Sequence, residues 1–416
     1  MKMKIILAIA LSMLLSGCIN LFGPDKEGWK SVQKREFLSI LERDDYMSLC
    51  NQKRLYKEVQ NSRDSVLMTK LLTAYANNLA NSCIDLKRFA ASQRAKKAQK
   101  IDTHFSTYQE KKISSVMLQN KLRAGMSIQN ILRPYVPTSP QFLLLRDQYR
   151  GHKATASKKQ LKRLRLNIER SKLMNPKLGT HYALVNIPEY KVRMIENGKT
   201  ALSFAVIVGK TNMQTPVFSE NLKYVVINPQ WNVPDSIMRK SYIPKIKANP
   251  GWVAYKGMEI HRSYDLSTPK INPASVDWSK YPKEGKGHIP YKLIQVPSLK
   301  NGLGRVKFIF PNRYAVYMHD TQNKSLFKRK TRAFSHGCVR LGKPMTLLHH
   351  IAKNYTRASL SDVNTWYKSL KTKYLNLSKP LQVHIVYFTA YVDGAGKLHQ
   401  SPDIYGFDKS QHLNFK

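Results

Sequence analysis

The sequence predicts an α+β protein with a helical N-terminal half and a mainly β C-terminal half. Between residues 29 and 123 apolar side chains recur at spacings of three and four, and no proline occurs between residues 26 and 133, a pattern typical of amphipathic helices. From His181 onward the chain changes to short β-branched and aromatic runs that are separated by turn residues. We therefore expect a helical scaffold domain at residues 29–150 and a mainly β domain at residues 179–405.

The N-terminus has the features of an export signal. Lys2 and Lys4 precede an apolar stretch, residues 5–15, that is too short to span a bilayer as a mature helix. This stretch runs into Leu-Ser-Gly-Cys at residues 15–18, which resembles the lipobox of bacterial lipoproteins. The alternative is a buried N-terminal helix with a chance cysteine.

The lipobox reading has consequences for location. We expect residues 1–17 to be removed, Cys18 to carry the lipid and residues 18–28 to act as a tether on a membrane. Because isoleucine rather than aspartate occupies position 19, the resemblance implies a periplasmic protein that is lipid-anchored to the outer membrane of a Gram-negative bacterium.

The charge balance is strongly positive. Lys and Arg total 70 against 26 acidic residues, which gives a formal net charge of +44. Such a field attracts polyanions, namely nucleic acid, anionic lipid or an acidic cell-wall polymer. An export signal places the protein where chromosomal DNA is absent, so we expect no nucleic-acid partner.

The two predicted domains are joined by a basic segment, residues 151–178. We interpret it as a linking helix with a solvated cationic face; a polyanion-binding patch is the alternative.

In the β domain, Asn197-Gly198 predicts a hairpin because both turn positions need positive φ. The polar, proline-rich residues 232–291 are interpreted as an insertion that covers one side of the sheet, and residues 406–416 as a tail. The predicted strands are residues 182–187, 191–195, 202–208, 224–228, 293–296, 306–310, 315–318 and 382–392, the last run holding a pair of strands that the Asp393-Gly394 turn closes.

A candidate catalytic pattern lies in the second half of this domain. Cys338 occurs in Ser-His-Gly-Cys-Val-Arg, and a cysteine nucleophile needs a base that helps to form the thiolate. His319 can supply that base from the end of a different strand. Gly337 lets the chain turn tightly, so that backbone N–H groups face an incoming carbonyl. Arg340 is a candidate partner for a substrate carboxylate, with a structural salt bridge as the alternative.

These residues resemble the motif of the L,D-transpeptidase catalytic domain family (YkuD type), which places a histidine upstream of Ser/Thr-His-Gly-Cys, an apolar residue and Arg or Asn. The resemblance covers roughly residues 165–405 and is strongest to the larger Gram-negative members. It implies that Cys338 is the nucleophile, that His319 is the base and that Gly337 and Cys338 supply oxyanion-hole N–H groups. It also implies that residues 232–291 form a lid-like capping segment. Supporting roles are implied for the pocket aromatic Tyr317, for Asp320 as the residue that orients the imidazole largely through backbone, for Ser335 and His336 in the pocket wall, and for Arg340.

A zinc site is the competing interpretation of this cluster, because His319, His336 and Cys338 are all possible ligands. No fourth ligand occurs at a sensible spacing. We expect no metal and no cofactor, since a thiolate and oxyanion donors would supply the chemistry.

The remaining cysteines are informative once these roles are assigned. An exported protein meets an oxidising compartment in which spare thiols pair. If Cys18 is acylated and Cys338 is catalytic, Cys50 and Cys83 are left as a disulfide; two separate buried thiols are the alternative.

The resemblance implies a peptidoglycan L,D-transpeptidase. Such an enzyme releases D-Ala from a donor tetrapeptide stem and transfers the acyl group to an acceptor stem as a 3→3 cross-link, or attaches a protein to the wall. An L,D-carboxypeptidase would share every catalytic residue. A non-catalytic lipoprotein that binds the wall by charge is the alternative from a different class.

Overall fold

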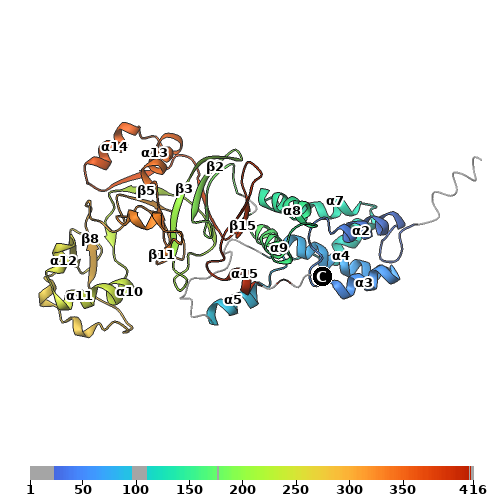
Figure 1. Ribbon diagram of the computed structural model, residues 1–416, viewed down its shortest axis with the longest axis horizontal. Helices are drawn as coiled ribbons and strands as arrows, with labels where there is room; N and C mark the ends of the chain where they lie inside the picture. Colours follow the sequence, from blue (N-terminus) through green and yellow to red (C-terminus); the bar gives the residue numbers. More distant parts are fainter. Residues whose placement is uncertain (1–22, 96–109, 176–177, 412, 414–416) are drawn as a thin grey trace, which may run out of the picture.

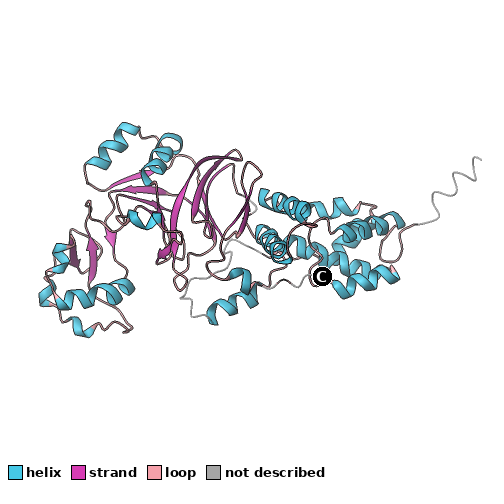
Figure 2. Cartoon of the chain, viewed as in Figure 1, coloured by secondary structure: helices cyan, strands magenta, loops and turns pink. Residues whose placement is uncertain are grey.

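The computed structural model describes residues 23–95, 110–175, 178–411 and 413. It has a helical region at one end, a large curled sheet in the middle and a smaller helix-and-strand unit at the other end (Figures 1 and 2). The predicted signal peptide and Cys18 lie outside the described residues. None of the described helices is both long and apolar enough to cross a membrane.

The helical N-terminal region is confirmed. Apart from α5 (Leu86–Ala95), whose Phe89 packs in the core of the β domain, its helices share one apolar core. Polar side chains cap several of their first turns, as Asp64 does by accepting from the Leu67 backbone N–H. Trp29 is 1 % exposed, and its indole N–H donates to Thr69 Oγ1 at 2.9 Å. The helices are α2 (Ser31–Arg43), α3 (Lys53–Ser62), α4 (Ser65–Asn81), α5 (Leu86–Ala95), α6 (Ser115–Arg123), α7 (Ile128–Leu132), the 3-10 helix η1 (Arg133–Tyr135) and α8 (Pro140–His152).

The central sheet is mostly antiparallel. Within the described part of the chain it has 11 strands, in the order β13-β5-β9-β10-β12-β3-β2-β1-β14-β4, with β11 paired to β3. Three of its pairs are parallel, namely β1 with β14, β10 with β12 and β11 with β3. The strands are β1 (His181–Asn186), β2 (Lys191–Glu196), β3 (Lys199–Gly209), β4 (Phe218–Asn221), β5 (Tyr224–Ile227), β9 (Val306–Ile309), β10 (Met318–His319), β11 (Ala333–Ser335), β12 (Val339–Leu341), β13 (Lys373–Asn376) and β14 (Gln382–Val386).

The turn residues of the sequence predicted one hairpin of this sheet correctly. The predicted hairpin joins β2 to β3 with Asn197 and Gly198 at φ 50° and 78°. The strand predicted at 315–318 is wrong over most of its length, because Ala315 turns with φ 53° and pairing begins only at Met318.

The pairing predicted within residues 382–392 is also wrong. Its first half, β14, lies between β1 and β4 in the main sheet. Its second half, β15 (Ala390–Val392), pairs with β16 (Leu398–Gln400) across the turn that begins at Asp393. Alternation within one run cannot reveal that its two halves join different sheets.

The two faces of the central sheet differ in character. Phe308, Met318 and Val339 point into the main apolar core, which α13 (Pro344–Tyr355) covers with leucine and isoleucine side chains; α14 (Leu360–Lys368) packs against α13. The residues that alternate with them along the same strands point to the opposite face. That second face carries the candidate site.

The basic linking segment contains α9 (Lys158–Lys172), and the expectation of a solvated cationic face is wrong for its second half. Arg165 and all following residues of the helix are buried, because α9 packs between the scaffold and the β domain. Lys172 and Glu169 are both 0 % exposed and form an ion pair of 2.9 Å, while Arg170 pairs with Asp408 at 2.8 Å. Helical periodicity does not show that such charges find partners from distant segments.

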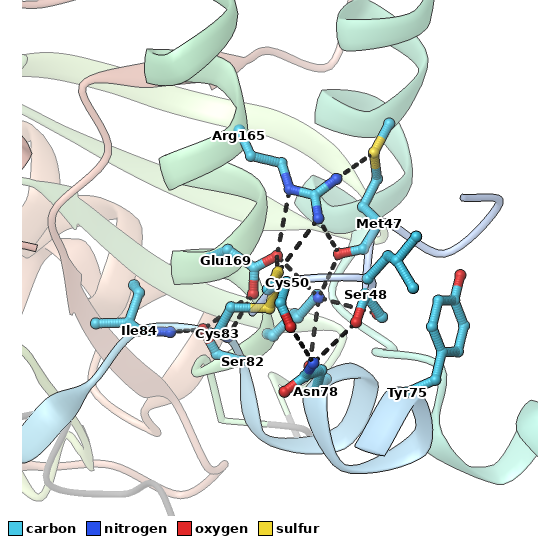
Figure 3. The surroundings of a disulfide bond; sticks show 12 residues. Met47, Ser48, Cys50, Tyr75, Asn78, Ser82, Cys83, Ile84, Arg165 and Glu169 are labelled. Carbon is cyan, nitrogen blue, oxygen red and sulfur yellow. Dashed lines mark hydrogen bonds and ion pairs between the residues drawn. A yellow bond between two sulfur atoms is a disulfide. The ribbon is translucent and has the colours of Figure 1, made fainter. Parts of the chain in front are cut away.

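The Cys50–Cys83 disulfide is confirmed, with the two Cα atoms 6.0 Å apart. It lies against the buried half of α9 (Figure 3). Glu169 accepts from the Cys83 backbone N–H at 2.8 Å, and Arg165 Nη2 lies 3.4 Å from Cys50 Sγ. The two sulfurs and the Glu169 carboxylate lie within 4.8 Å of one another, but sulfurs joined in a disulfide are not thiolate ligands for a metal.

The insertion forms a unit with its own core. Val233, Ile246 and Trp278 are among the buried residues at its centre, and it lies at the end of the molecule away from the scaffold (Figure 1). It is therefore a small packed unit and not an extended cover over the sheet. Its main elements are α10 (Asp235–Ile237), the π-helical turn η2 (Met238–Tyr242), α11 (Ile243–Ala248), α12 (Trp252–Tyr255), and a sheet of β6 (Trp231–Asn232), β8 (Lys292–Gln295) and β7 (Met258–His261) in that order.

The buried ion pair on α9 leads to a stability prediction. Replacing Glu169→Gln leaves the Lys172 ammonium buried without its carboxylate, so we expect the free energy of unfolding to fall by about 3–5 kcal/mol. Urea denaturation followed by circular dichroism measures this loss. The double variant Glu169→Gln/Lys172→Met should recover much of it, because no uncompensated charge then remains at that position. An unchanged midpoint for Glu169→Gln would contradict the assignment.

Candidate active site

The candidate site is a patch on three neighbouring strands of the central sheet. Lys307 on β9 lies directly opposite His319 on β10, which lies directly opposite Arg340 on β12. Side chains of directly paired residues share a face of the sheet. Tyr317 and Cys338 directly precede β10 and β12. The Tyr317 ring lies 5.5 Å from the His319 ring, and Cys338 interacts with Tyr317, Lys307 and Arg340. The structure thus brings together four of the predicted site residues, and adds Lys307.

Cys338 is a free, half-buried cysteine. Its sulfur lies 3.8 Å from the carbonyl oxygen of Ala315. Burial raises the pKa of the Cys338 thiol, while hydrogen bonding with Tyr317 and the positive charges of Lys307 and Arg340 act in the opposite direction. The residue is thus partly exposed, and the pKa of its thiol is raised by burial despite these neighbours.

His319 is buried and is oriented by backbone groups. It is 5 % exposed, and its Nδ1 lies 3.4 Å from the Leu303 carbonyl oxygen. Burial, followed by the charge of Arg340, lowers the pKa of His319 to about 3, against a smaller opposing effect of backbone hydrogen bonds. The imidazole is thus neutral at pH 7. If Nδ1 carries the proton toward Leu303, Nε2 keeps the lone pair that a base requires.

Asp320 reaches the imidazole through its backbone, and its carboxylate serves the neighbouring loop. Asp320 Oδ2 accepts from the Arg305 N–H at 2.9 Å, and Asp320 also pairs with Lys324. Gly304 has φ +69°, and a Cβ there would lie 2.3 Å from the Asp320 side chain. This close approach fixes the loop whose Leu303 carbonyl contacts His319.

The turn before Cys338 is held by Ser335. Its Oγ donates to the Cys338 carbonyl oxygen at 2.5 Å and accepts from the Gly337 N–H at 3.2 Å. Gly337 has φ 115°, a conformation that favours glycine. The Gly337 N–H, one of the two predicted oxyanion donors, is therefore engaged within the turn. Among the described residues no acceptor contacts the Cys338 N–H, which leaves that group as the open donor.

Thr215 and Tyr405 also hold this turn, although neither residue was predicted to contribute to the site. Thr215 Oγ1 donates to the Gly337 carbonyl oxygen at 2.7 Å and accepts from the Gly209 N–H at 2.9 Å. Tyr405 accepts from the Thr215 N–H at 3.1 Å and donates to the Gly209 carbonyl oxygen at 2.7 Å. The Thr-Pro sequence at 215–216 was a usable signal for the first residue; nothing local marks the second.

Arg340 lies at the side of the site that faces the insertion. Its charge interacts with Cys338 and with Tyr242 of the insertion, so the insertion approaches the site through this tyrosine. In the described part of the chain Arg340 makes no ion pair, and its buried Nε has no hydrogen-bond partner. The structural salt bridge considered for Arg340 is therefore wrong.

The zinc interpretation finds no matching geometry. Across residues 23–95, 110–175, 178–411 and 413, the one group of three potential ligand atoms within 4.8 Å is the one at the disulfide. His336 is exposed, whereas His319 is buried.

The comparisons bear on the same segment. Residues 180–360 match the L,D-transpeptidase catalytic domain family, YkuD. A protein from Haemophilus influenzae named "Putative L,D-transpeptidase" is 35 % identical over 229 residues, which is 55 % of this chain and 45 % of that protein. The chain thus spans about half the length of this curated relative. The patch formed by His319, Cys338 and Arg340 lies within the YkuD region.

Solved structures show only weak likeness. The avibactam carbamoyl enzyme of Ldtfm is 11 % identical with a TM-score of 0.22, over 50 % of each chain. The catalytic domain of the E. faecium L,D-transpeptidase is 13 % identical with a TM-score of 0.21, over 49 % of this chain and 95 % of that one. At these scores the likeness adds nothing to the description of the site.

The buried, neutral imidazole predicts a pH dependence of stability. The pKa of His319 is about 3 in the folded chain and close to 6.5 when unfolded, so between these values the unfolded chain binds a proton that the folded chain does not. Stability is therefore lost as pH falls through this window, by about 2 kcal/mol at pH 5. The variant His319→Gln should show a smaller fall in the free energy of unfolding between pH 7 and pH 5 than the wild type, measured by urea titration. Parallel curves for the two proteins would contradict the assignment.

Proposed function

We propose that the chain is a peptidoglycan L,D-transpeptidase whose acyl carrier is Cys338. The observation that carries the proposal is the free, half-buried Cys338 thiol on the same sheet face as a neutral His319 and two cations. This arrangement suits attack on an acyl group next to negatively charged substrate groups. The match of residues 180–360 to the L,D-transpeptidase catalytic domain supports the assignment.

The proposed reaction has two steps. The Cys338 thiolate attacks the carbonyl carbon between the L-centre and the D-residue of a tetrapeptide stem, with the Cys338 N–H as a donor to the developing oxyanion. The C–N bond then breaks, D-Ala leaves with a proton that His319 is placed to relay, and a thioester remains on sulfur. The side-chain amine of a second stem attacks the thioester, which forms a 3→3 amide and frees the thiol. Attachment of a protein to the wall would use the same thioester.

We also propose a substrate contact for Arg340 and a cellular location. Arg340 is without an ion pair among the described residues and suits a carboxylate on the donor or acceptor stem. We place the enzyme in the periplasm, anchored through lipid on Cys18 to the outer membrane, on the strength of the sequence at residues 15–18 alone.

Replacing the nucleophile tests the chemistry. Cys338→Ala should abolish thioester formation, seen by intact-mass spectrometry as the loss of a carbapenem adduct, because the sulfur that would carry the acyl group is removed. Cross-link formation should be lost with it. The circular dichroism spectrum should be unchanged, since the side chain is half-buried and small. Persistent adducts at the site in this variant would reject the mechanism.

Product analysis separates transpeptidase from carboxypeptidase activity. Incubation with purified disaccharide tetrapeptides should give 3→3 dimers and free D-Ala, resolved by liquid chromatography with mass spectrometry. Tripeptide monomers without dimers would mean that water is the acceptor and that the enzyme trims stems. If neither product forms and wall binding is salt-sensitive in both wild type and Cys338→Ala, the protein binds the wall without this chemistry.

A further inference from the structure

We propose that Lys307, together with Arg340, provides the positive charge that balances the Cys338 thiolate, so that His319 stays neutral in the resting enzyme. This inference rests on the proposed role of Cys338 as the nucleophile. It assigns Lys307, on a strand that carries no motif residue, as a positioning residue that acts on the sulfur through its charge.

The register of the sheet places a cation on each side of His319. The imidazole of His319 has Lys307 directly opposite on one side and Arg340 directly opposite on the other. Lys307 Nζ also lies 4.1 Å from the centre of the Tyr317 ring, and Tyr317 is hydrogen-bonded with Cys338. The lysine therefore lies over the aromatic ring that contacts the sulfur.

Neither cation is neutralised by a carboxylate. For the described residues, no ion pair involves Lys307 or Arg340, and the Lys307 ammonium contacts the Tyr317 ring rather than a hydrogen-bond acceptor. The nearby Asp320 carboxylate is already engaged by backbone N–H groups and by Lys324. A partly desolvated ammonium without a counter-ion costs free energy, and elsewhere in this chain buried cations such as Lys172 are paired. The anion that this patch can supply is the thiolate of Cys338.

The imidazole is poorly placed to become the counter-ion. A proton on His319 would create a third positive charge on this face of the sheet. Burial, followed by the charge of Arg340, lowers the pKa of His319 to about 3. When the Cys338 S–H bond breaks, the electron pair stays on sulfur and the proton passes to solvent. His319 is then available, still neutral, for the proton transfers that accompany departure of the amine.

The other groups that face Lys307 do not change this balance. Tyr317 directly precedes β10, His319 lies in β10 and Arg340 in β12, and Tyr242 of the insertion interacts with Arg340. On its other side Lys307 is paired with Val226 of β5, which is apolar. Burial lowers the pKa of Lys307 and the charge of Cys338 raises it, as expected of two groups that favour each other's ionised form.

The test is a thiol titration that uses no cell-wall substrate. The rate of iodoacetamide alkylation is followed across pH at the Cys338 peptide by mass spectrometry, with the full chain and an intact Cys50–Cys83 disulfide. Lys307→Met should lower the alkylation rate at pH 7 about tenfold, which corresponds to a rise of one unit in the thiol pKa. Lys307→Arg keeps the charge and should restore most of the rate.

Two further variants make the test specific. Lys373→Met makes the same substitution at an exposed position of β13 in the same sheet and should leave the titration unchanged. His319→Gln should keep the thiolate fraction within about threefold of wild type. A tenfold loss in His319→Gln, with no shift in Lys307→Met, would overturn the proposal in favour of an imidazolium partner. If Lys307→Met does not fold, as judged by circular dichroism, Lys307→Gln takes its place.

Failure of this inference and failure of the proposed function give different results. A shifted titration without any cross-linking would leave the charge pairing intact and reject only the transpeptidase assignment. If the enzyme forms cross-links but Lys307→Met leaves the thiol titration unchanged, the transpeptidase assignment would stand and the role of Lys307 would be rejected.

Discussion

The pairing of three short strands, β9, β10 and β12, is the constraint on which the site depends. β10 is only two residues long, and its register places Met318 in the core and His319 on the opposite face. A slip of one residue would exchange these two side chains. The apolar contacts of Phe308, Met318 and Val339 in the core therefore also hold the imidazole, the sulfur and the two cations on one surface.

A continuous set of contacts connects this surface to the scaffold. The Arg170 guanidinium of α9 lies 5.3 Å from the centre of the Tyr387 ring, and Tyr387 stacks on Tyr405 with ring centres 5.6 Å apart. Tyr405 contacts Thr215, which holds the Gly337 carbonyl beside Cys338. The buried half of α9 thus helps to support the turn that carries Cys338, in addition to linking two domains.

Buried cations in this protein are paired with carboxylates on α9 and unpaired with described carboxylates at the candidate site. On α9 the cations are matched, as in the pair of Lys172 with Glu169, and they stabilise the packing of distant segments. At the candidate site, Lys307 and Arg340 form no ion pair with a carboxylate of the described residues, and their charges act on the Cys338 thiol. Unpaired buried charge of this kind is costly for stability, and such costs are typical of functional sites.

Local patterns in the sequence were sufficient for the fold class and the hairpin at Asn197-Gly198. The Cys50–Cys83 disulfide followed instead from the cysteine count and the expected export. His319 and Cys338 were singled out because they stand in a short, recognisable pattern. Propensity, turn chemistry and motif spacing act over a few residues, and a single sequence displays them directly.

Other features were decided only by tertiary structure. The burial of α9, the separation of β14 from β15, the supporting contacts of Thr215 and Tyr405, and the row formed by Lys307 with His319 and Arg340 all depend on which distant segments become neighbours. Strand register and the pairing of buried charges arise from packing of the whole chain. Their energies belong to contacts between segments, so no single stretch of sequence contains them.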